Sequence, residues 1–171
     1  PNSSLSSLFS LSLHLHLSPP LLSPQPQVLL LDGKAQSAEA DEHVYHEMLV
    51  HPALVAHGSP RRVFIAGGGE GATAREVLKH ASVEKCLMVD IDRVVCDFCE
   101  AHLPANKAAF ADPRLELVCD DAAAQLRAAP DAAFDVIVGD LADPVAGGPC
   151  FQLYTREFYE NRSEERRVGK E

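Results

Sequence analysis

Acidic side chains follow three apolar runs of this sequence, at places where a turn is expected. Asp90 and Asp92 come after KCLMV, Asp120 and Asp121 come after RLELV, and Asp140 comes after FDVIV. Carboxylates grouped in this way can accept hydrogen bonds from hydroxyls, attract a cation or take a proton from a reacting amine. The pattern therefore favours a site for a cationic small molecule that also carries hydroxyl groups.

A further acid lies in a loop rich in glycine. The loop reads GGGEG and follows the apolar run RVFIA, so that Glu70 stands among Gly67, Gly68, Gly69 and Gly71. Closely spaced glycines let a ligand approach the backbone, although they also occur in ordinary turns. A phosphate-binding loop would offer Lys followed by Ser or Thr, whereas Glu70 repels phosphate and attracts an ammonium or sulfonium. We therefore expect a nucleoside without a phosphate.

Four units of similar design must position these residues, and each begins with a short apolar strand that ends near glycine or aspartate. The strands are expected at 62–66, 85–89, 114–118 and 134–138. Helical segments are expected at 72–80, 93–102 and 122–128. Apolar strands that alternate with helices are typical of a parallel sheet covered on both faces. The predicted fold class is α/β, with a Rossmann-like parallel sheet whose strands end at one edge, where ligands bind.

The rest of the chain divides by composition into segments of different character. Residues 1–27 form a Ser/Leu/Pro/His tract that we expect to be disordered. Residues 28–60 are expected to hold a strand at 28–31 and a helix at 40–49 that Pro52 limits. We expect an incomplete Rossmann-like core at 61–161 and a polar tail of non-native character at 162–171.

Composition bounds the partners and the compartment. The 171 residues suffice for one cored domain, and the net charge of -10 argues against binding to nucleic acid. No run in the Leu-rich opening is long enough to span a bilayer, so no membrane association is expected. The five cysteines form no regular framework, which favours reduced thiols in the cytoplasm. The Ser-rich, acid-free opening leaves plastid import as an alternative.

Several separate motifs occur together between residues 28 and 160. They are LDGKAQ at 31–36, YHEM at 45–48, GGGEG at 67–71, VDID at 89–92 and GDLADPV at 139–145. In this order they resemble the polyamine aminopropyltransferases, the spermidine synthase family. The details are most similar to its thermospermine synthase branch, because His46 replaces the usual Gln, Glu70 replaces Asp, and Leu141-Ala142 replaces Ser-Ser.

The resemblance implies a role for each polar residue of these motifs. Asp140 matches the family's proton acceptor, while Tyr45 and Asp143 match residues that face the amine acceptor. The implied site for the donor, decarboxylated S-adenosylmethionine, is lined by Gln36, His46, Glu70, Asp90, Asp120 and Asp121. From the sequence alone, Asp120 and Asp121 could equally cap the following helix, and Asp140 and Asp143 could belong to an ordinary turn.

The implied reaction needs no cofactor and no metal, because the donor carries its own electrophile, the carbon beside its sulfonium. The spacing of His43, His46 and His51 matches no HExxH-type motif. The family activity would transfer an aminopropyl group to a polyamine, spermidine or alternatively putrescine, in a protein expected to be a homo-oligomer when complete. Two alternative hypotheses for the function are an S-adenosylmethionine-dependent methyltransferase and a non-catalytic family member. We expect the fragment, expressed alone, to be poorly soluble or inactive.

Overall fold

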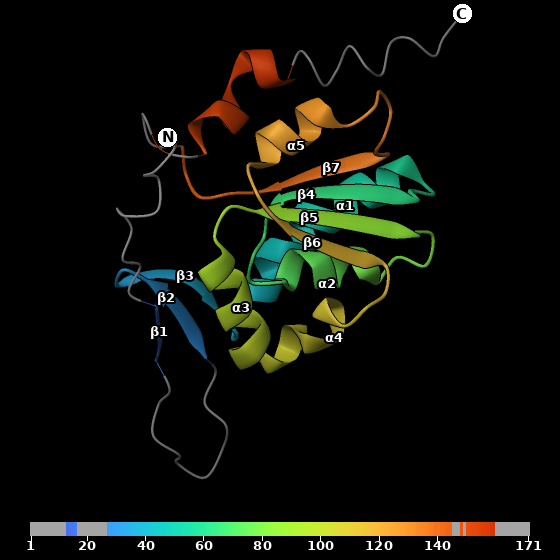
Figure 1. Cartoon of the computed structure of the whole chain (residues 1–171). Helices are drawn as coiled ribbons and strands as arrows, with labels where there is room; N and C mark the ends of the chain where they lie inside the picture. Colours follow the sequence, from blue (N-terminus) through green and yellow to red (C-terminus); the bar gives the residue numbers. More distant parts are fainter. Residues whose placement is uncertain (1–12, 17–26, 145–147, 149, 160–171) are drawn as a thin grey trace, which may run out of the picture. The chain divides into compact units, whose positions relative to one another are not determined.

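The computed structural model describes residues 13–16, 27–144, 148 and 150–159, and the chain divides into two compact units, Pro1–Tyr45 and His46–Glu171 (Figure 1). The boundary lies inside helix α1 (Glu42–His57), whereas the composition predicts a segment boundary near residue 60. The reason is packing, because Val50 and Leu54 of this helix are buried in the core of the second unit.

The first unit contains a three-stranded antiparallel sheet in the order β1-β2-β3. Its strands are β1 (Leu13–His16), β2 (Val28–Leu31) and β3 (Lys34–Ala38). Asp32 and Gly33 both have positive φ, which suits the two-residue turn of a hairpin between β2 and β3. Strand β1 lies within the segment predicted to be disordered, and its LHLH alternation has the period of a strand. Apart from Gln27, the rest of that segment lies outside the described residues.

Helix α1 is longer than the predicted 40–49 and continues through Pro52, which was wrongly expected to limit it. Proline removes one backbone donor and strains the preceding turn, at a cost of about 3 kcal/mol. Burial of the Val50 and Leu54 side chains on either side of Pro52 offsets this cost, since each fully buried aliphatic side chain contributes about 1.5–3 kcal/mol.

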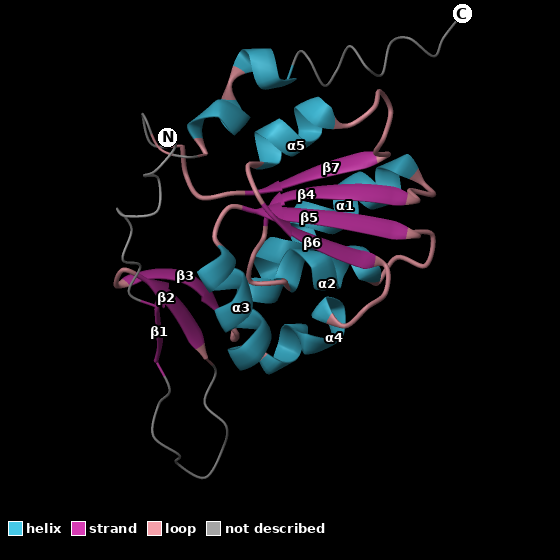
Figure 2. Cartoon of the chain, in the orientation of Figure 1, coloured by secondary structure: helices cyan, strands magenta, loops and turns pink. Residues whose placement is uncertain are grey.

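The second unit is built on a four-stranded parallel sheet, as predicted. Its strands are β4 (Arg62–Gly67), β5 (Lys85–Asp90), β6 (Leu115–Cys119) and β7 (Val136–Asp140), in the order β6-β5-β4-β7 (Figure 2). The chain runs outward from β4 to β6 and then returns to the other side of β4. The strand order therefore reverses between β4 and β7, the position where open α/β sheets bind ligands.

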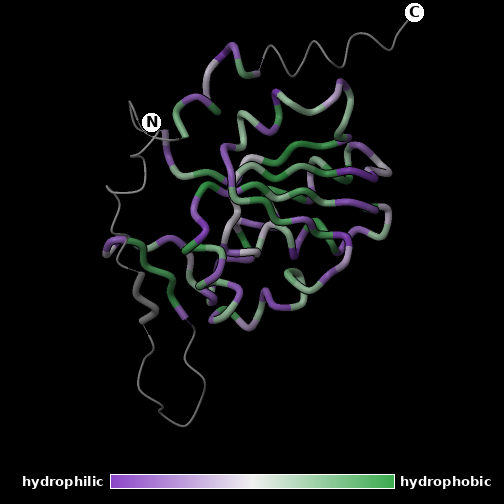
Figure 3. The backbone as a smooth tube through the Cα atoms, viewed as in Figure 1, coloured by the Kyte–Doolittle hydropathy of each residue, from purple (hydrophilic) through white to green (hydrophobic). Residues whose placement is uncertain are grey.

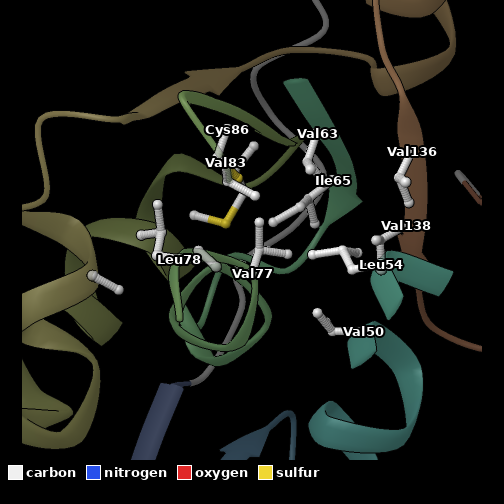
Figure 4. Packing of buried hydrophobic residues seen from close by; sticks show 13 residues of the cluster. Val50, Leu54, Val63, Ile65, Val77, Leu78, Val83, Cys86, Val136 and Val138 are labelled. Carbon is white, nitrogen blue, oxygen red and sulfur yellow. The ribbon is translucent and has the colours of Figure 1, made fainter. Parts of the chain in front are cut away.

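Helices cover both faces of this sheet, and the apolar strands between the helices form the interior of the second unit (Figure 3). On one face, α1, α2 (Ala72–Leu78) and α4 (Lys107–Phe110) pack on residues such as Ile65 and Val138 (Figure 4). On the other face, α5 (Ala122–Ala128) and the 3₁₀ helix η2 (Phe151–Tyr154) pack on Phe64 and Val89. Helix α3 (Arg93–His102) and the 3₁₀ helix η1 (Pro104–Asn106) connect β5 to α4.

Candidate active site

The carboxyl ends of the central strands bring the predicted acids to one edge of the sheet. Gly67 at the end of β4 pairs with Asp140 at the end of β7, and Asp90 at the end of β5 pairs with Cys119 of β6. Because β4 lies between β5 and β7, the glycine loop that follows β4 separates Asp90 from Asp140. The predicted convergence of Asp90, Asp140 and the glycine loop is therefore what the structure shows.

The glycine loop is packed directly against the backbone of Asp140. The Gly68 amide donates to the Asp140 carbonyl oxygen over 3.1 Å. A Cβ at Gly67, which has a φ of +82°, would lie 2.0 Å from the same oxygen. No other residue type fits there, because both the left-handed backbone and the close approach require glycine. The first two glycines of the motif thus fix the position of the Asp140 backbone.

The next glycine of the loop holds Asp90. The Gly69 amide donates to Asp90 Oδ2 over 2.9 Å, and the Asp92 amide donates to Asp90 Oδ1 over 2.9 Å. Burial nevertheless raises the pKa of Asp90, and the neighbouring charges of Asp92 and Asp140 act in the same direction. The two amides fix the orientation of a carboxylate whose remaining lone pairs can accept hydrogen bonds from a ligand's hydroxyls.

The Asp140 carboxylate is held by a hydroxyl from helix α2. Thr73 Oγ1 donates to Asp140 Oδ2 over 2.6 Å, and Thr73 is completely buried. His46 Nε2 lies 3.9 Å from the same oxygen. The Asp140 side chain keeps 14% of its surface exposed, so that its charge remains within reach of a ligand.

His46 links the glycine loop to Asp140. Its Nε2 atom lies 3.2 Å from Glu70 Oε1, and the residue is 4% exposed. The ring therefore stands between two carboxylates, those of Glu70 and Asp140. An imidazole can donate one hydrogen bond when neutral and carry a positive charge when protonated, so His46 can moderate the repulsion between the two acids.

A polar and an aromatic residue support the loop from the segment after α3. Asn106 Nδ2 donates to the Glu70 carbonyl oxygen over 2.8 Å, and Asn106 is 4% exposed. A Cβ at Gly71 would lie 2.5 Å from the ring of Phe110, so glycine is required for this contact. These contacts fix the backbone from which the Glu70 side chain projects.

The acids after β6 are bonded by the helix that follows them, and Asp121 also by a distant residue. The Asp121 carboxylate caps helix α5 by accepting from the amides of Ala123 and Ala124, and it accepts from the Gln152 side-chain amide over 3.1 Å. Asp120 accepts from the Gln125 amide nitrogen over 2.6 Å, and this bond together with the Asp121 amide lowers the pKa of Asp120. Asp120 is exposed, so its carboxylate can still meet a ligand. The donor contact assigned to each of these acids stays a prediction.

Asp143 lies on the exposed segment after β7, three residues beyond Asp140. Tyr154 holds this segment in place, because its hydroxyl donates to the carbonyl oxygens of Leu141, over 3.3 Å, and Ala142, over 3.2 Å. Burial raises the pKa of Tyr154, and the charges of Asp143 and Asp140 add to this effect. A neutral phenol thus lies near both acids.

Gln36 and Tyr45 belong to the first unit. Gln36 lies on β3 and its side-chain amide donates to the Lys34 carbonyl oxygen over 3.4 Å. Tyr45 lies in the first half of α1. Their predicted parts in binding the donor and the acceptor stay predictions.

The profile described as the spermine/spermidine synthase domain matches residues 42–166. The chain belongs to this family. Among curated relatives, thermospermine synthase ACAULIS5 of Arabidopsis thaliana is 58% identical over 135 residues, which are 79% of this chain and 40% of that protein. A polyamine aminopropyltransferase of Aeropyrum pernix is 54% identical over 139 residues, 81% of this chain and 44% of that protein.

Solved structures of the spermine/spermidine synthase family share the fold. A crystal structure of spermidine synthase in complex with a transition state analogue superposes with a TM-score of 0.78 at 39% identity, over 88% of this chain and 49% of that one. The spermidine synthase of Thermotoga maritima gives a TM-score of 0.75 at 39% identity, over 88% of this chain and 48% of that one. The chain thus spans less than half the length of these relatives.

Three residues that shape the candidate site escaped prediction from sequence. Thr73, Asn106 and Tyr154 each make a polar contact with a segment more than ten residues away. The signal that could have found Thr73 is a single hydroxyl between two apolar helix residues, Ala72 and Ala74. Nothing in the local sequence distinguishes Asn106 or Tyr154 from surface residues.

The second unit also contains a His/Glu cluster with ligand atoms close enough to hold a metal ion. One atom each from Glu47, His51 and Glu76 lie within 4.8 Å of one another. The Glu76 carboxylate already pairs with Lys79 over 2.6 Å and with Arg75 over 3.0 Å, so a cation would have to displace these charges. The expectation that the protein needs no metal stays a prediction.

The CxxC pair, Cys96 and Cys99, is buried in helix α3 with both thiols free. Burial raises the pKa of both, to about 12 for Cys99, and the charge of Asp90 adds to the effect. Metal ligation and redox exchange need thiolates, which a raised pKa disfavours. The structure therefore agrees with the interpretation of these cysteines as small helix residues.

Within the described parts of the chain, no helix has the length and apolar character to cross a bilayer.

Proposed function

We propose that the complete protein is a polyamine aminopropyltransferase. It moves the aminopropyl group of decarboxylated S-adenosylmethionine to spermidine and forms thermospermine. The observation that carries the proposal is the acidic edge of the sheet, where Asp90 and Asp140 flank a glycine loop that bears Glu70. The 58% identity to a protein named thermospermine synthase supports this choice of acceptor.

The chemistry requires a base beside an electrophilic carbon. A polyamine nitrogen is protonated at neutral pH and cannot attack until a carboxylate takes its proton. Asp140 is the proposed base, because its carboxylate is oriented by Thr73 and partly exposed at the strand-order reversal. The nitrogen then attacks the carbon beside the donor's sulfonium. The new C–N bond forms as the C–S bond breaks, and methylthioadenosine leaves with the bond electrons on sulfur.

The same acids select the donor. Glu70 and Asp90 favour the sulfonium and the terminal ammonium of decarboxylated S-adenosylmethionine, whereas the extra carboxylate of S-adenosylmethionine is repelled. Asp90 accepts the ribose hydroxyls in this proposal, since its carboxylate is fixed by two backbone amides. In support, one of the solved spermidine synthase structures holds the transition state analogue AdoDATO.

The test is an assay of the full-length protein with each donor and each acceptor. Product analysis by mass spectrometry should find thermospermine and methylthioadenosine from decarboxylated S-adenosylmethionine and spermidine. Transfer to putrescine alone would identify a spermidine synthase instead. A methylated product from S-adenosylmethionine would identify a methyltransferase, and no transfer with any pair would identify a non-catalytic member of the family.

We also propose that the protein acts in the cytoplasm and that its small-molecule partner is the polyamine. The free thiols of all five cysteines support a reducing compartment. Imaging of a tagged full-length protein tests the location, with plastid import as the contrary outcome. The expected homo-oligomer stays a prediction that light scattering of the full-length protein can check.

A further inference from the structure

We propose that Thr73 is a positioning residue for aminopropyl transfer, which it serves by orienting the carboxylate of Asp140. The inference rests on the proposed function, because it takes Asp140 to be the base. It goes further by assigning a mechanistic task to a helix residue that lies outside the motifs and is closed to solvent.

The contact between the two side chains is short and buried. Thr73 Oγ1 lies 2.6 Å from Asp140 Oδ2, and Thr73 is 0% exposed. An ionised carboxylate can only accept, so the hydroxyl donates. Hydrogen bonds from a hydroxyl to a charged oxygen at this distance are among the stronger ones in proteins. The bond therefore restricts rotation of the carboxylate about its Cβ–Cγ bond.

Different groups hold the backbone and the carboxylate of Asp140. The Asp140 backbone accepts from the Gly68 amide, and a Cβ at Gly68 would approach Asp140 Oδ2 to 3.3 Å. The glycine loop thus sets the backbone position, while the Thr73 hydroxyl holds Oδ2 of the carboxylate from helix α2.

Orientation of this kind affects turnover more than binding. A base removes a proton efficiently only when its lone pair points along the bond that breaks, and misplacement by about 1 Å can cost roughly 100-fold in rate. Loss of the hydroxyl should therefore lower kcat while leaving donor affinity nearly unchanged.

The experiment compares Thr73→Val and Thr73→Ser in the full-length enzyme with decarboxylated S-adenosylmethionine and spermidine. Valine keeps the shape of the side chain and removes the hydroxyl, whereas serine keeps the hydroxyl. We expect Thr73→Val to lower kcat by about 10- to 100-fold. Donor affinity by calorimetry should change little. Thr73→Ser should retain most of the parent's kcat, because it keeps the hydroxyl.

Thr155 provides the matched control, because its hydroxyl bonds within its own turn, to the Gln152 carbonyl oxygen. Thr155→Val should leave kcat unchanged. A merely structural role for Thr73 would lower the melting temperature and weaken donor binding together with kcat. This result, or unaltered kinetics of Thr73→Val in an active parent, would overturn the inference alone. If the parent transfers no aminopropyl group, the proposed function fails and the inference fails with it.

Discussion

Helix α1 carries two histidines that each face a glutamate across the same distance. His46 Nε2 lies 3.2 Å from Glu70 at the carboxyl edge of the sheet, and His51 Nε2 lies 3.2 Å from Glu76 within helix α2. The geometry of the two contacts is alike. Their electrostatic surroundings and their exposure differ, and this difference separates a site for ligands from an anchor between helices.

In the contact between His51 and Glu76, the charge of the glutamate is balanced by cationic side chains of the same chain. Glu76 is completely buried, and burial works against its charged form, but hydrogen bonds from Lys79 and Arg75 outweigh this effect and lower the pKa of Glu76. The Glu70 and Asp140 side chains keep 12% and 14% of their surface exposed. A ligand can therefore reach both carboxylates at the edge of the sheet, whereas the Glu76 carboxylate is closed to solvent.

The largest expected effect follows from removing the proposed base. Asp140→Asn keeps the shape of the side chain but cannot accept the amine proton. Positioned bases typically contribute about 10²- to 10⁴-fold, so kcat of the full-length protein for the proposed transfer should fall by that factor, while calorimetry should find donor affinity little changed. Near-normal turnover with both spermidine and putrescine would show that Asp140 is not the base.

Asp90→Asn should act on the donor instead. A hydrogen bond to a charged group contributes about 1.5–3 kcal/mol, so the dissociation constant of the donor should rise by roughly 10- to 100-fold, with a smaller change in kcat. Asp92→Asn is the control, because Asp92 caps helix α3 and asparagine caps almost as well. Equal losses of affinity in the two variants would point to general disorder of the loop rather than a ribose contact.

Substituting the two glutamates in turn tests the comparison directly. Glu76→Gln should lower the free energy of unfolding by about 2 kcal/mol, because it breaks charge-assisted bonds in the core. It should also weaken the pH dependence below 4.5, since a carboxylate with a lowered pKa stabilises the fold above that value and loses this contribution as pH falls. Glu70→Gln should spare stability and reduce discrimination against S-adenosylmethionine. Urea denaturation and donor calorimetry measure the two effects. A loss of stability in Glu70→Gln together with reduced donor discrimination in Glu76→Gln would contradict the distinction between the two glutamates.

The smallest expected effect concerns His80, whose Nε2 lies 2.9 Å from His51 Nδ1. Burial and the adjacent His51 ring lower the pKa of His80 below 6.5, against an opposing effect of Glu76. The unfolded chain therefore binds this proton more readily, and stability should be full above pH 6.5 and decline below it. His80→Asn should flatten the decline of the melting temperature just below pH 6.5. An unchanged slope would mean that His80 does not contribute to it.

The repeating units of the sheet could be predicted from sequence because their determinants are local. Apolar runs of five residues followed by glycine or aspartate predict strands and their ends, and all four strands lie within two residues of the expected positions. Parallel strands place their carboxyl ends at one edge. The convergence of Asp90, Asp140 and the glycine loop follows from the sequence for that physical reason.

The tertiary structure decided what those acids contact. Helix α1 passes Pro52 because distant core residues bury Val50 and Leu54, a contribution that no local pattern reveals. The same packing brings His46 to Glu70, and helix α2 turns the hydroxyl of Thr73 toward Asp140, 67 residues further along the chain. Such contacts join segments that lie far apart in the sequence, so no periodic pattern of residues predicts them. Residue types and strand ends are properties of the sequence, whereas the partner and the orientation of each carboxylate exist only once the elements have packed together.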